Sequence, residues 1–226
     1  IMFVLLPLLV FEASLEINLS VLKPLIAPVL YASTIGFAIM MTMAAAIIYW
    51  LFDYPSGFPV IAALLTGLVI SATDPAAVVS QLREANAPEK LSTLIEGESL
   101  FNDASAIVLY GILVAVALGD TQPTATNILS KLAYVLIGGA LIGVALGWLM
   151  AKLMKLISTI EASTYIGALL VTYGSFYIAE HMFHVSGVVA VLLAGLTVNH
   201  MAVDVCKRLR HQWHPMANVA NMIVFF

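Results

Sequence analysis

Charged side chains are scarce in this chain of 226 residues: 10% are Asp, Glu, Lys or Arg, whereas a soluble domain has about 25%. The 9 basic residues are scattered and form no cluster that could follow a phosphate backbone, which argues against nucleic-acid binding. The single cysteine, Cys206, excludes a disulfide within this sequence. Apolar residues are abundant instead, at 62% with a mean hydropathy of +1.04. This composition predicts an integral membrane protein.

Apolar stretches of about 20 residues are the unit to count, because a helix of that length crosses about 30 Å of hydrocarbon. They predict an all-α fold, a polytopic membrane helix bundle of about eight spans. Both ends of the sequence fall inside apolar runs, so we interpret it as an internal fragment of a longer chain. The expected spans are residues 1–15, 25–51, 58–82, 91–119, 128–157, 162–183 and 186–201, and one that begins near His214.

Basic residues occur in alternate loops, which indicates how the chain crosses the membrane. Eight of the nine lie after the first, third, fifth and seventh spans. By the positive-inside rule these loops are expected to be cytoplasmic, most simply in a cell (inner) membrane. They are Lys23, Arg83, Lys90, Lys152, Lys155, Lys207, Arg208 and Arg210.

The third span contains a proline near its centre, in ALLTGLVISATDPAAVVSQL. Pro75 removes a backbone donor and disfavours helical geometry at Asp74, so the helix should break between Thr73 and Pro75. Asp74 and Pro75 would then begin a second half-helix as N-cap and first residue. Broken helices in transporters line cavities and bind ions through released carbonyls. The alternative is an ordinary capping aspartate at the membrane surface.

The fourth span begins with polar groups, in EGESLFNDASAIVLY. Ser99, Asn102 and Asp103 are spaced to share one helix face, and Glu98 flanks it. Ionisable groups at membrane depth are unfavourable and indicate function. The alternative is that Asp103 is neutralised by a cationic side chain outside this sequence.

Glu12 lies near the end of the first span, in PLLVFEASLEIN. It could line a polar cavity, or it could be an interfacial carboxylate. The carboxylates, the hydroxyl and the unwound carbonyls described above would offer oxygen ligands rather than thiolates or imidazoles. Such a set suits a hard monovalent cation.

Three further motifs have weaker implications. Gly139 and Gly143 form a GxxxG pattern that permits close helix packing. The order of residues in AEHMFH, at positions 179–184, differs from the H-E-x-x-H of zinc proteases, which favours an interfacial cluster over a metal site. The segment CKRLRHQWHP, at positions 206–215, is typical of a basic, amphipathic membrane-surface segment.

Four stretches, in the order LLPLLVFEASL, SATDPAAVVSQL, EGESLFNDASAIVLY and AEHMFHVSGVVAVLLAGL, strongly resemble the monovalent cation/proton antiporter-1 family, the sodium/proton exchangers. The resemblance covers nearly the whole chain. It implies a homodimeric transporter built from inverted repeats, with a mobile core and a dimerising panel. Residues 25–119 would be the first half of the core. Residues 1–24 would be a panel helix with its loop, and residues 120–226 further panel helices.

The resemblance also implies roles for individual residues. Asp103 would bind the cation and the exchanged proton in turn, and Asn102 would support this region structurally. The backbone carbonyl of Thr73 would be a ligand, and Asp74 would act through water. The full oxygen set implied for Na⁺ is Asp103, Asp74, Thr73, Ser99 and Glu12.

Two implied elements are missing from the sequence. The family pairs the glutamate that matches Glu98 with an arginine on a later core helix, and the inverted second half of the core is also absent. This fragment alone is therefore expected not to transport. Asn102 stands where electrogenic relatives carry a second aspartate, which favours one-for-one, electroneutral exchange.

The predicted function is secondary active transport, not enzymatic catalysis. Na⁺ or another monovalent cation would exchange for H⁺ by competition at Asp103 with alternating access, without a cofactor. Two alternatives remain open. A passive cation channel could use the same oxygen ligands, and an intramembrane aspartyl protease would also place two aspartates on neighbouring helices. In such a protease the catalytic aspartate would be expected in a Gly-x-Gly-Asp motif, whereas Asp103 follows Leu-Phe-Asn.

Overall fold

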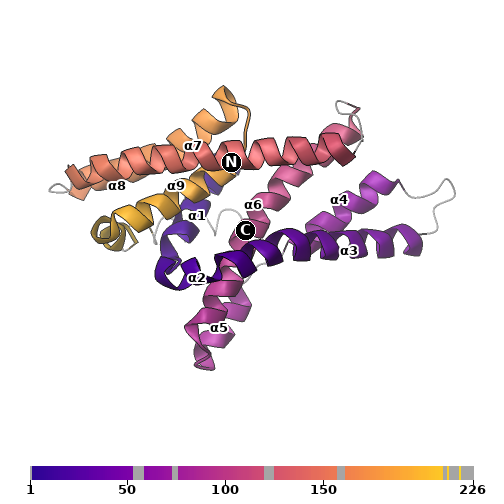
Figure 1. Cartoon of the computed structure of the whole chain (residues 1–226), viewed down its shortest axis with the longest axis horizontal. Coiled ribbons are helices and arrows are strands. Elements are labelled where there is room, and N and C mark those ends of the chain that lie inside the picture. The colour runs from indigo at the N-terminus through magenta and orange to yellow at the C-terminus, as the bar shows by residue number, and fades with distance from the viewer. Residues whose placement is uncertain are drawn as a thin grey trace. The chain divides into compact units, whose positions relative to one another are not determined.

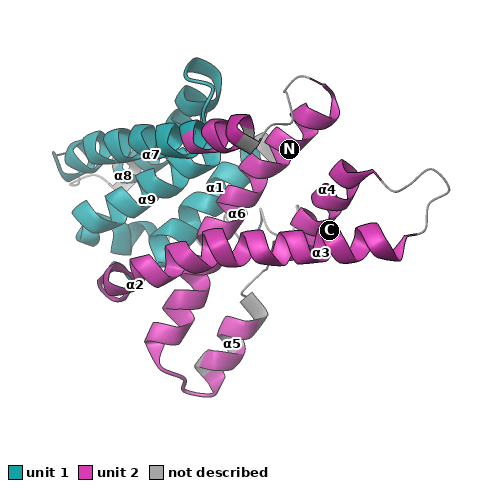
Figure 2. Ribbon diagram, turned by 45° about the vertical axis from the view of Figure 1, so that its right-hand side comes forward, with its two compact units in different colours: residues 1–19, 134–226 teal, residues 20–133 magenta. Residues whose placement is uncertain are grey.

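The computed structural model describes residues 2–52, 59–72, 76–119, 125–156, 161–210, 213 and 219, and the regular structure among them is helical (Figure 1). The chain divides into two compact units. Unit 1 comprises residues 1–19 and 134–226, and unit 2 comprises residues 20–133 (Figure 2).

Among the described residues, three helices are long and apolar enough to cross a membrane: Leu19–Leu51, Glu89–Ala117 and Leu129–Leu156. A fourth candidate is the bent pair Gly187–Met201 and Val203–Arg210, whose axes differ by 117°. The other predicted spans correspond to shorter helices, except the span expected near His214, which lies almost wholly outside the described residues. The predicted multi-pass membrane helix bundle is confirmed.

Unit 2 begins with α2 (Leu19–Tyr31), a π-helical turn η1 (Ala32–Gly36) and α3 (Phe37–Leu51), which form one continuous helix. The sequence predicted a start at Leu25, after Pro24. Instead the helix runs through both Pro24 and Pro28. Membrane helices tolerate proline where side-chain hydroxyls and local π geometry satisfy the backbone. Further along the same helix, within the π-helical turn, the Thr34 hydroxyl donates to the carbonyl of Leu30 at 2.5 Å.

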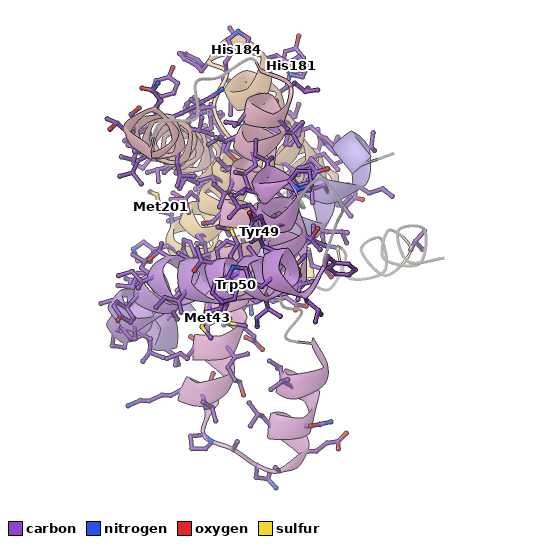
Figure 3. All side chains as sticks on the ribbon, turned by 90° about the vertical axis from the view of Figure 1, so that its right-hand side faces the viewer. Met43, Tyr49, Trp50, His181, His184 and Met201 are labelled. Atoms are coloured by element: carbon purple, nitrogen blue, oxygen red, sulfur yellow. The ribbon has the colours of Figure 1, made fainter. Side chains whose placement is uncertain are left out.

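One face of α3 is exposed along its length. Ile39, Met43, Ile47 and Trp50 follow one another at helical spacing and are 51%, 59%, 61% and 84% exposed (Figure 3). Tyr49 lies beside Trp50 at the end of the helix. An apolar stripe that ends in aromatic rings suits contact with acyl chains and then with the headgroup region.

The opposite side of α3 packs on α4 (Val60–Ser71). The buried positions of α4 include the small residues Ala63, Gly67 and Ser71, four apart. A Cβ on Gly67 would lie 2.6 Å from the Met41 carbonyl oxygen of α3. Only glycine allows the two backbones to come this close.

Unit 2 also contains the helices α5 and α6 and the start of α7 (Ala125–Leu156). α5 (Ala76–Glu84) ends before Asn86, whose φ of 52° is left-handed, and α6 (Glu89–Ala117) begins after Pro88. α5 packs beside the first turns of α6 as a helical hairpin (Figure 2). α6 ends at Ala117, and Gly119, whose φ is 84°, follows the C-cap as the left-handed glycine that commonly terminates a helix. α6 also contacts α4 and η1.

In unit 1, α9 (Gly187–Met201) is the most buried helix, and both α1 (Met2–Glu16) and α8 (Glu161–Tyr177) pack on it. Trp213 is fully buried and stacks at a tilt against Phe11 and Tyr165, with ring centroids 5.2 and 5.6 Å apart. Its indole nitrogen donates to the carbonyl of Leu8 at 3.4 Å. Residues near both ends of the sequence thus share one core.

The GxxxG pattern lies on α7 (Ala125–Leu156) and faces α9. Added Cβ atoms at Gly139 and Gly147 would lie 2.6 and 2.7 Å from the carbonyl oxygens of Ser186 and Ala194. At Gly143 the clash with the Ala190 carbonyl would be the most severe. Two rows of small residues, each with a four-residue period, therefore bring the backbones of α7 and α9 together.

The AEHMFH segment includes a π-helical turn, η2 (Ile178–Met182), that leads into α9. The Glu180 carboxylate accepts a hydrogen bond from the backbone N–H of Gly187 at 2.9 Å. His181 stacks on Tyr177 with ring centroids 4.6 Å apart, and His184 turns the chain with a left-handed φ of 53° (Figure 3). No group of three or more His, Cys, Asp or Glu side chains in the described part of the chain could hold a metal ion.

The basic segment predicted to lie on the membrane surface begins as a helix, Val203–Arg210. Val205, Cys206 and Leu209 are buried on one side of it, and Lys207 and Arg208 are exposed on the other. The helix is therefore amphipathic, and its apolar side packs within the protein.

Candidate functional site

The chain leaves the helical conformation at the predicted place. α4 ends at Ser71, Ala72 is extended with φ −71° and ψ 114°, and α5 begins at Ala76. The predicted ligands Thr73 and Asp74, and Pro75 with them, lie outside the described residues. A helix that ends here leaves the carbonyl groups of its last turn without partners inside the helix.

Asn102 of α6 contacts the end of α4. Its side-chain amide donates to the backbone carbonyl of Ser71 at 3.4 Å. Asn102 is 1% exposed and Ser71 is 2% exposed, so water does not compete for this bond. The Ser71 hydroxyl donates to the Gly67 carbonyl at 2.7 Å. The amide of α6 therefore holds the broken end of α4 by its backbone.

The same amide also reaches one turn back along α6. Nδ2 of Asn102 lies 3.4 Å from a carboxylate oxygen of Glu98, which is half-buried. Oδ1 of Asn102 is buried, and no hydrogen-bond partner for it is present among the described residues. Asn102 thus links the glutamate of the GESLFND motif to the end of α4.

Asp103 differs from Ser99 and Asn102 of α6 in how far its side chain is exposed. Ser99 is 3% exposed and faces the packed side with Asn102, whereas the side chain of Asp103 is exposed. The sequence predicted a single face for all three residues. Residues three and four positions apart share one side of a helix but still differ in direction. Here the difference is enough for Ser99 and Asn102 to be buried while Asp103 is exposed. Ser99 and Asp103 both have interaction partners.

Glu12 belongs to unit 1, where it is half-buried on α1 and has an interaction partner. The described residues of unit 2 thus bring together Asn102, Glu98 and Ser71. Ser71 had not been predicted. The recurrence of small residues at positions 63, 67 and 71 could have indicated it, because it marks the packed face of α4 that ends beside the break.

Comparison with known proteins identifies the family. Residues 1–226 match the family model described as sodium/hydrogen exchanger, transmembrane. Sodium/hydrogen exchanger 7 of Arabidopsis thaliana is 32% identical over 227 residues, which cover 98% of this chain and 20% of the relative. The Na⁺/H⁺ antiporter NhaP of Pseudomonas aeruginosa is 31% identical over 229 residues, covering 97% of this chain and 53% of the relative. The chain thus spans about half the length of the Pseudomonas NhaP, 53%, and 20% of the Arabidopsis exchanger.

A solved structure has the same fold. The sodium proton antiporter MjNhaP1 of Methanocaldococcus jannaschii matches with a TM-score of 0.72 at 20% identity, over 98% of this chain and 53% of that one. The sequence motifs, the helical fold and the family match agree, and the predicted resemblance is confirmed. This chain belongs to the sodium/hydrogen exchanger family.

Proposed function

We propose that the full-length protein exchanges Na⁺, or another monovalent cation, for H⁺ across a membrane. The observation that carries this proposal is the bond from Asn102 to the Ser71 carbonyl. It joins the Asn-Asp pair of α6 to the end of the broken helix, so the two most specific motifs of the sequence meet in unit 2. Family membership and the relatives named as Na⁺/H⁺ antiporters support the same activity.

Asp103 is the proposed exchange group. Its carboxylate holds either a proton or the cation, so the two compete for one site and exchange needs no further coupling device. Movement between inward-open and outward-open states occurs only when Asp103 is neutralised, since an uncompensated charge costs several kcal/mol in the hydrophobic barrier. Asp74, the Thr73 carbonyl, Ser99 and Glu12 are the further oxygen ligands in this proposal.

The position of Asn102 supports electroneutral exchange. A neutral amide donates to a carbonyl here, and a second carboxylate at this position would add a titratable charge to each cycle. Each net charge moved is worth about 2.3 kcal/mol per 100 mV. One-for-one exchange is thus driven by the two ion gradients and not by the membrane potential.

The proposed architecture, which follows from the resemblance, has a mobile core and a dimerising panel. Residues 25–119 form the first half of the mobile core, and residues 1–24 and 120–226 belong to a panel through which two copies form a homodimer. The loops after the first, third, fifth and seventh predicted spans face the cytoplasm, where their basic residues are retained.

The experiment is Asp103→Asn in the full-length protein, reconstituted into vesicles with an imposed proton gradient. Cation-dependent proton movement is expected to be abolished while the protein stays folded. Glu89→Gln is the matched control, because Glu89 is an exposed acidic residue in the first turn of the same helix. Exchange retained in Asp103→Asn would refute the role of Asp103.

A second measurement tests competition and separates exchange from a channel. The apparent Na⁺ affinity is expected to fall as the pH is lowered, because protons displace the cation. A cation affinity that does not change with pH would contradict competition. Cation uptake that needs no opposing proton gradient would indicate a passive channel instead.

A further inference from the structure

Asn199, in the last turn of α9, holds the end of α1 by its backbone. Its side-chain nitrogen lies 3.1 Å from the carbonyl oxygen of Ser14, 3.1 Å from that of Leu15 and 3.0 Å from that of Ile17. α1 ends at Glu16, so the carbonyls of Ser14 and Leu15 belong to its final turn and lack partners within the helix, and Ile17 directly follows it. A single amide on α9 thus caps the C-terminal end of α1, and it is 6% exposed.

The oxygen of the same amide faces the helix that follows the 117° bend. Oδ1 of Asn199 accepts from Nη2 of Arg210 at 3.3 Å and from the thiol of Cys206 at 3.6 Å. Asn199 therefore joins α1, α9 and Val203–Arg210. Asparagine suits this position because its planar side chain carries donors on one side and an acceptor on the other. Aspartate would lack the donors, and alanine would lack both.

The charges on either side favour this orientation of the amide. The C-terminal end of α1 carries the negative end of its helix dipole, and the guanidinium of Arg210 is a cation. The N–H donors of Asn199 face the C-terminal end of α1, and its oxygen acceptor faces the guanidinium of Arg210. One turn before Asn199, the backbone of Gly195 lies against the side chain of Ser14. This contact also limits lateral movement of α1 against α9.

We propose that Asn199 is a positioning residue for cation binding, and that it acts through α1. Glu12 lies within about one turn of the carbonyls that Asn199 holds, and Glu12 is one of the cation ligands in the proposed function, where the family resemblance suggests it. Because a helix is stiff over this distance, fixing its last turn fixes the height and rotation of Glu12. This inference rests on the proposed function.

The first experiment is Asn199→Ala in the full-length protein. The KM for Na⁺ in proton-driven exchange is expected to rise roughly three- to tenfold, the effect of one or two lost hydrogen bonds on a binding step. Vmax is expected to change little, because Asp103 and the broken helix are untouched. A purely structural role would instead lower the amount of active protein, and with it Vmax, at constant KM.

A second variant keeps the test decisive if Asn199→Ala fails to fold. Arg210→Gln removes the cation from the oxygen side of the amide but leaves the bonds to α1, so a smaller rise in KM is expected. Lys207→Gln is the matched control, because it removes the same charge from an exposed position on the same helix. Its KM is expected to equal that of the wild type.

Cys206 provides a readout that does not depend on transport. Its side chain is 1% exposed, and its thiol donates to Asn199. Labelling by a water-soluble maleimide, localised to Cys206 by peptide mass spectrometry, is expected to be faster in Asn199→Ala and in Arg210→Gln than in the wild type or Lys207→Gln.

The outcomes separate the two proposals. An unchanged KM in Asn199→Ala and Arg210→Gln, with exchange intact, would overturn the positioning role even if labelling of Cys206 accelerates. Exchange that survives in Asp103→Asn would instead overturn the proposed function, and the positioning role with it.

Discussion

The side-chain amide of Asn102 donates a hydrogen bond to the backbone carbonyl of Ser71 at 3.4 Å, across 31 positions of sequence. This bond joins a helix interior to the end of a broken helix. Both groups are buried, so the loss of either partner leaves a polar group without water to replace it. The geometry of the break thus depends on a residue of another helix.

The first prediction concerns this bond. Asn102→Ala leaves the Ser71 carbonyl without its donor and removes the contact with Glu98. An unsatisfied buried carbonyl costs about 1–3 kcal/mol, so the free energy of unfolding should fall by that amount. Titration of the full-length protein with a denaturing detergent measures it.

Thr66→Val is the control for Asn102→Ala. The Thr66 hydroxyl is exposed on α4 and donates to the Ala62 carbonyl of its own helix at 2.8 Å, so its loss should change the unfolding free energy little. Equal effects of the two substitutions would show that the bond between α6 and α4 contributes no special stability.

The second prediction concerns the approach of α7 to α9. A Cβ at Gly143 would overlap the carbonyl oxygen of Ala190, and backbone atoms cannot move aside as a flexible side chain can. Gly143→Ala should therefore destabilise the protein by about 1–3 kcal/mol, the usual effect of overpacking. The midpoint of thermal unfolding in detergent provides the measurement.

Gly174→Ala is the matched substitution in the same unit. Gly174 is also helical, but nothing lies within 4 Å of an added Cβ. Alanine is favoured over glycine in a helix interior by roughly 0.5–1 kcal/mol, so this variant should be as stable as the wild type or more stable. If Gly143→Ala behaves in the same way, α7 and α9 are not in close backbone contact.

Features set by local chemistry could be predicted from the sequence. The break after Ser71 follows from Pro75, whose ring and missing N–H act on the residues beside it. The polar start of α6 was recognisable because carboxylates are rare in apolar runs. The start of the α2 helix was predicted six residues late, because proline usually ends helices in water but is tolerated inside membrane helices.

Contacts between distant segments could not be predicted in this way. The bonds from Asn199 to Ser14, Leu15 and Ile17 span at least 182 positions of sequence. Nothing near Asn199 in the sequence distinguishes it from an asparagine that ends an ordinary helix. Its role depends on α1 packing against α9, and that in turn depends on the shapes of complete helix faces.

The third prediction tests the crossing of α1 and α9. Gly195→Ala would place a methyl group on the Ser14 hydroxyl and close to the ring of Phe11, so it should destabilise the protein. Ser14→Gly removes the atoms that collide. It carries its own penalty of about 1 kcal/mol, because glycine is a poor helix former.

The double variant with Ser14→Gly and Gly195→Ala should be more stable than the sum of the two single effects predicts. Contacting residues show coupling energies of about 0.5–3 kcal/mol in such cycles. Unfolding free energies of the wild type and the three variants give the coupling. Strict additivity would mean that Ser14 and Gly195 are not in contact.

The fourth prediction concerns the N-terminus of α9. The carboxylate of Glu180 accepts from the backbone N–H of Gly187 at 2.9 Å, and the Ser186 hydroxyl accepts from that of Val189 at 3.2 Å. These bonds satisfy two of the N–H groups that a helix leaves without partners at its start, and a negative charge there also interacts favourably with the helix dipole.

Glu180→Ala should lower the unfolding free energy by about 0.5–2 kcal/mol, as the loss of a helix cap does. Glu180→Gln keeps an oxygen acceptor of the same length but no charge, so it should restore most of the hydrogen-bond contribution and lose only the dipole contribution of about 0.3–1 kcal/mol. High salt should then bring the wild type closer to Glu180→Gln, because salt screens the charge but not the bond. If Glu180→Gln is as unstable as Glu180→Ala at every salt concentration, the carboxylate does not cap α9 through its hydrogen bond.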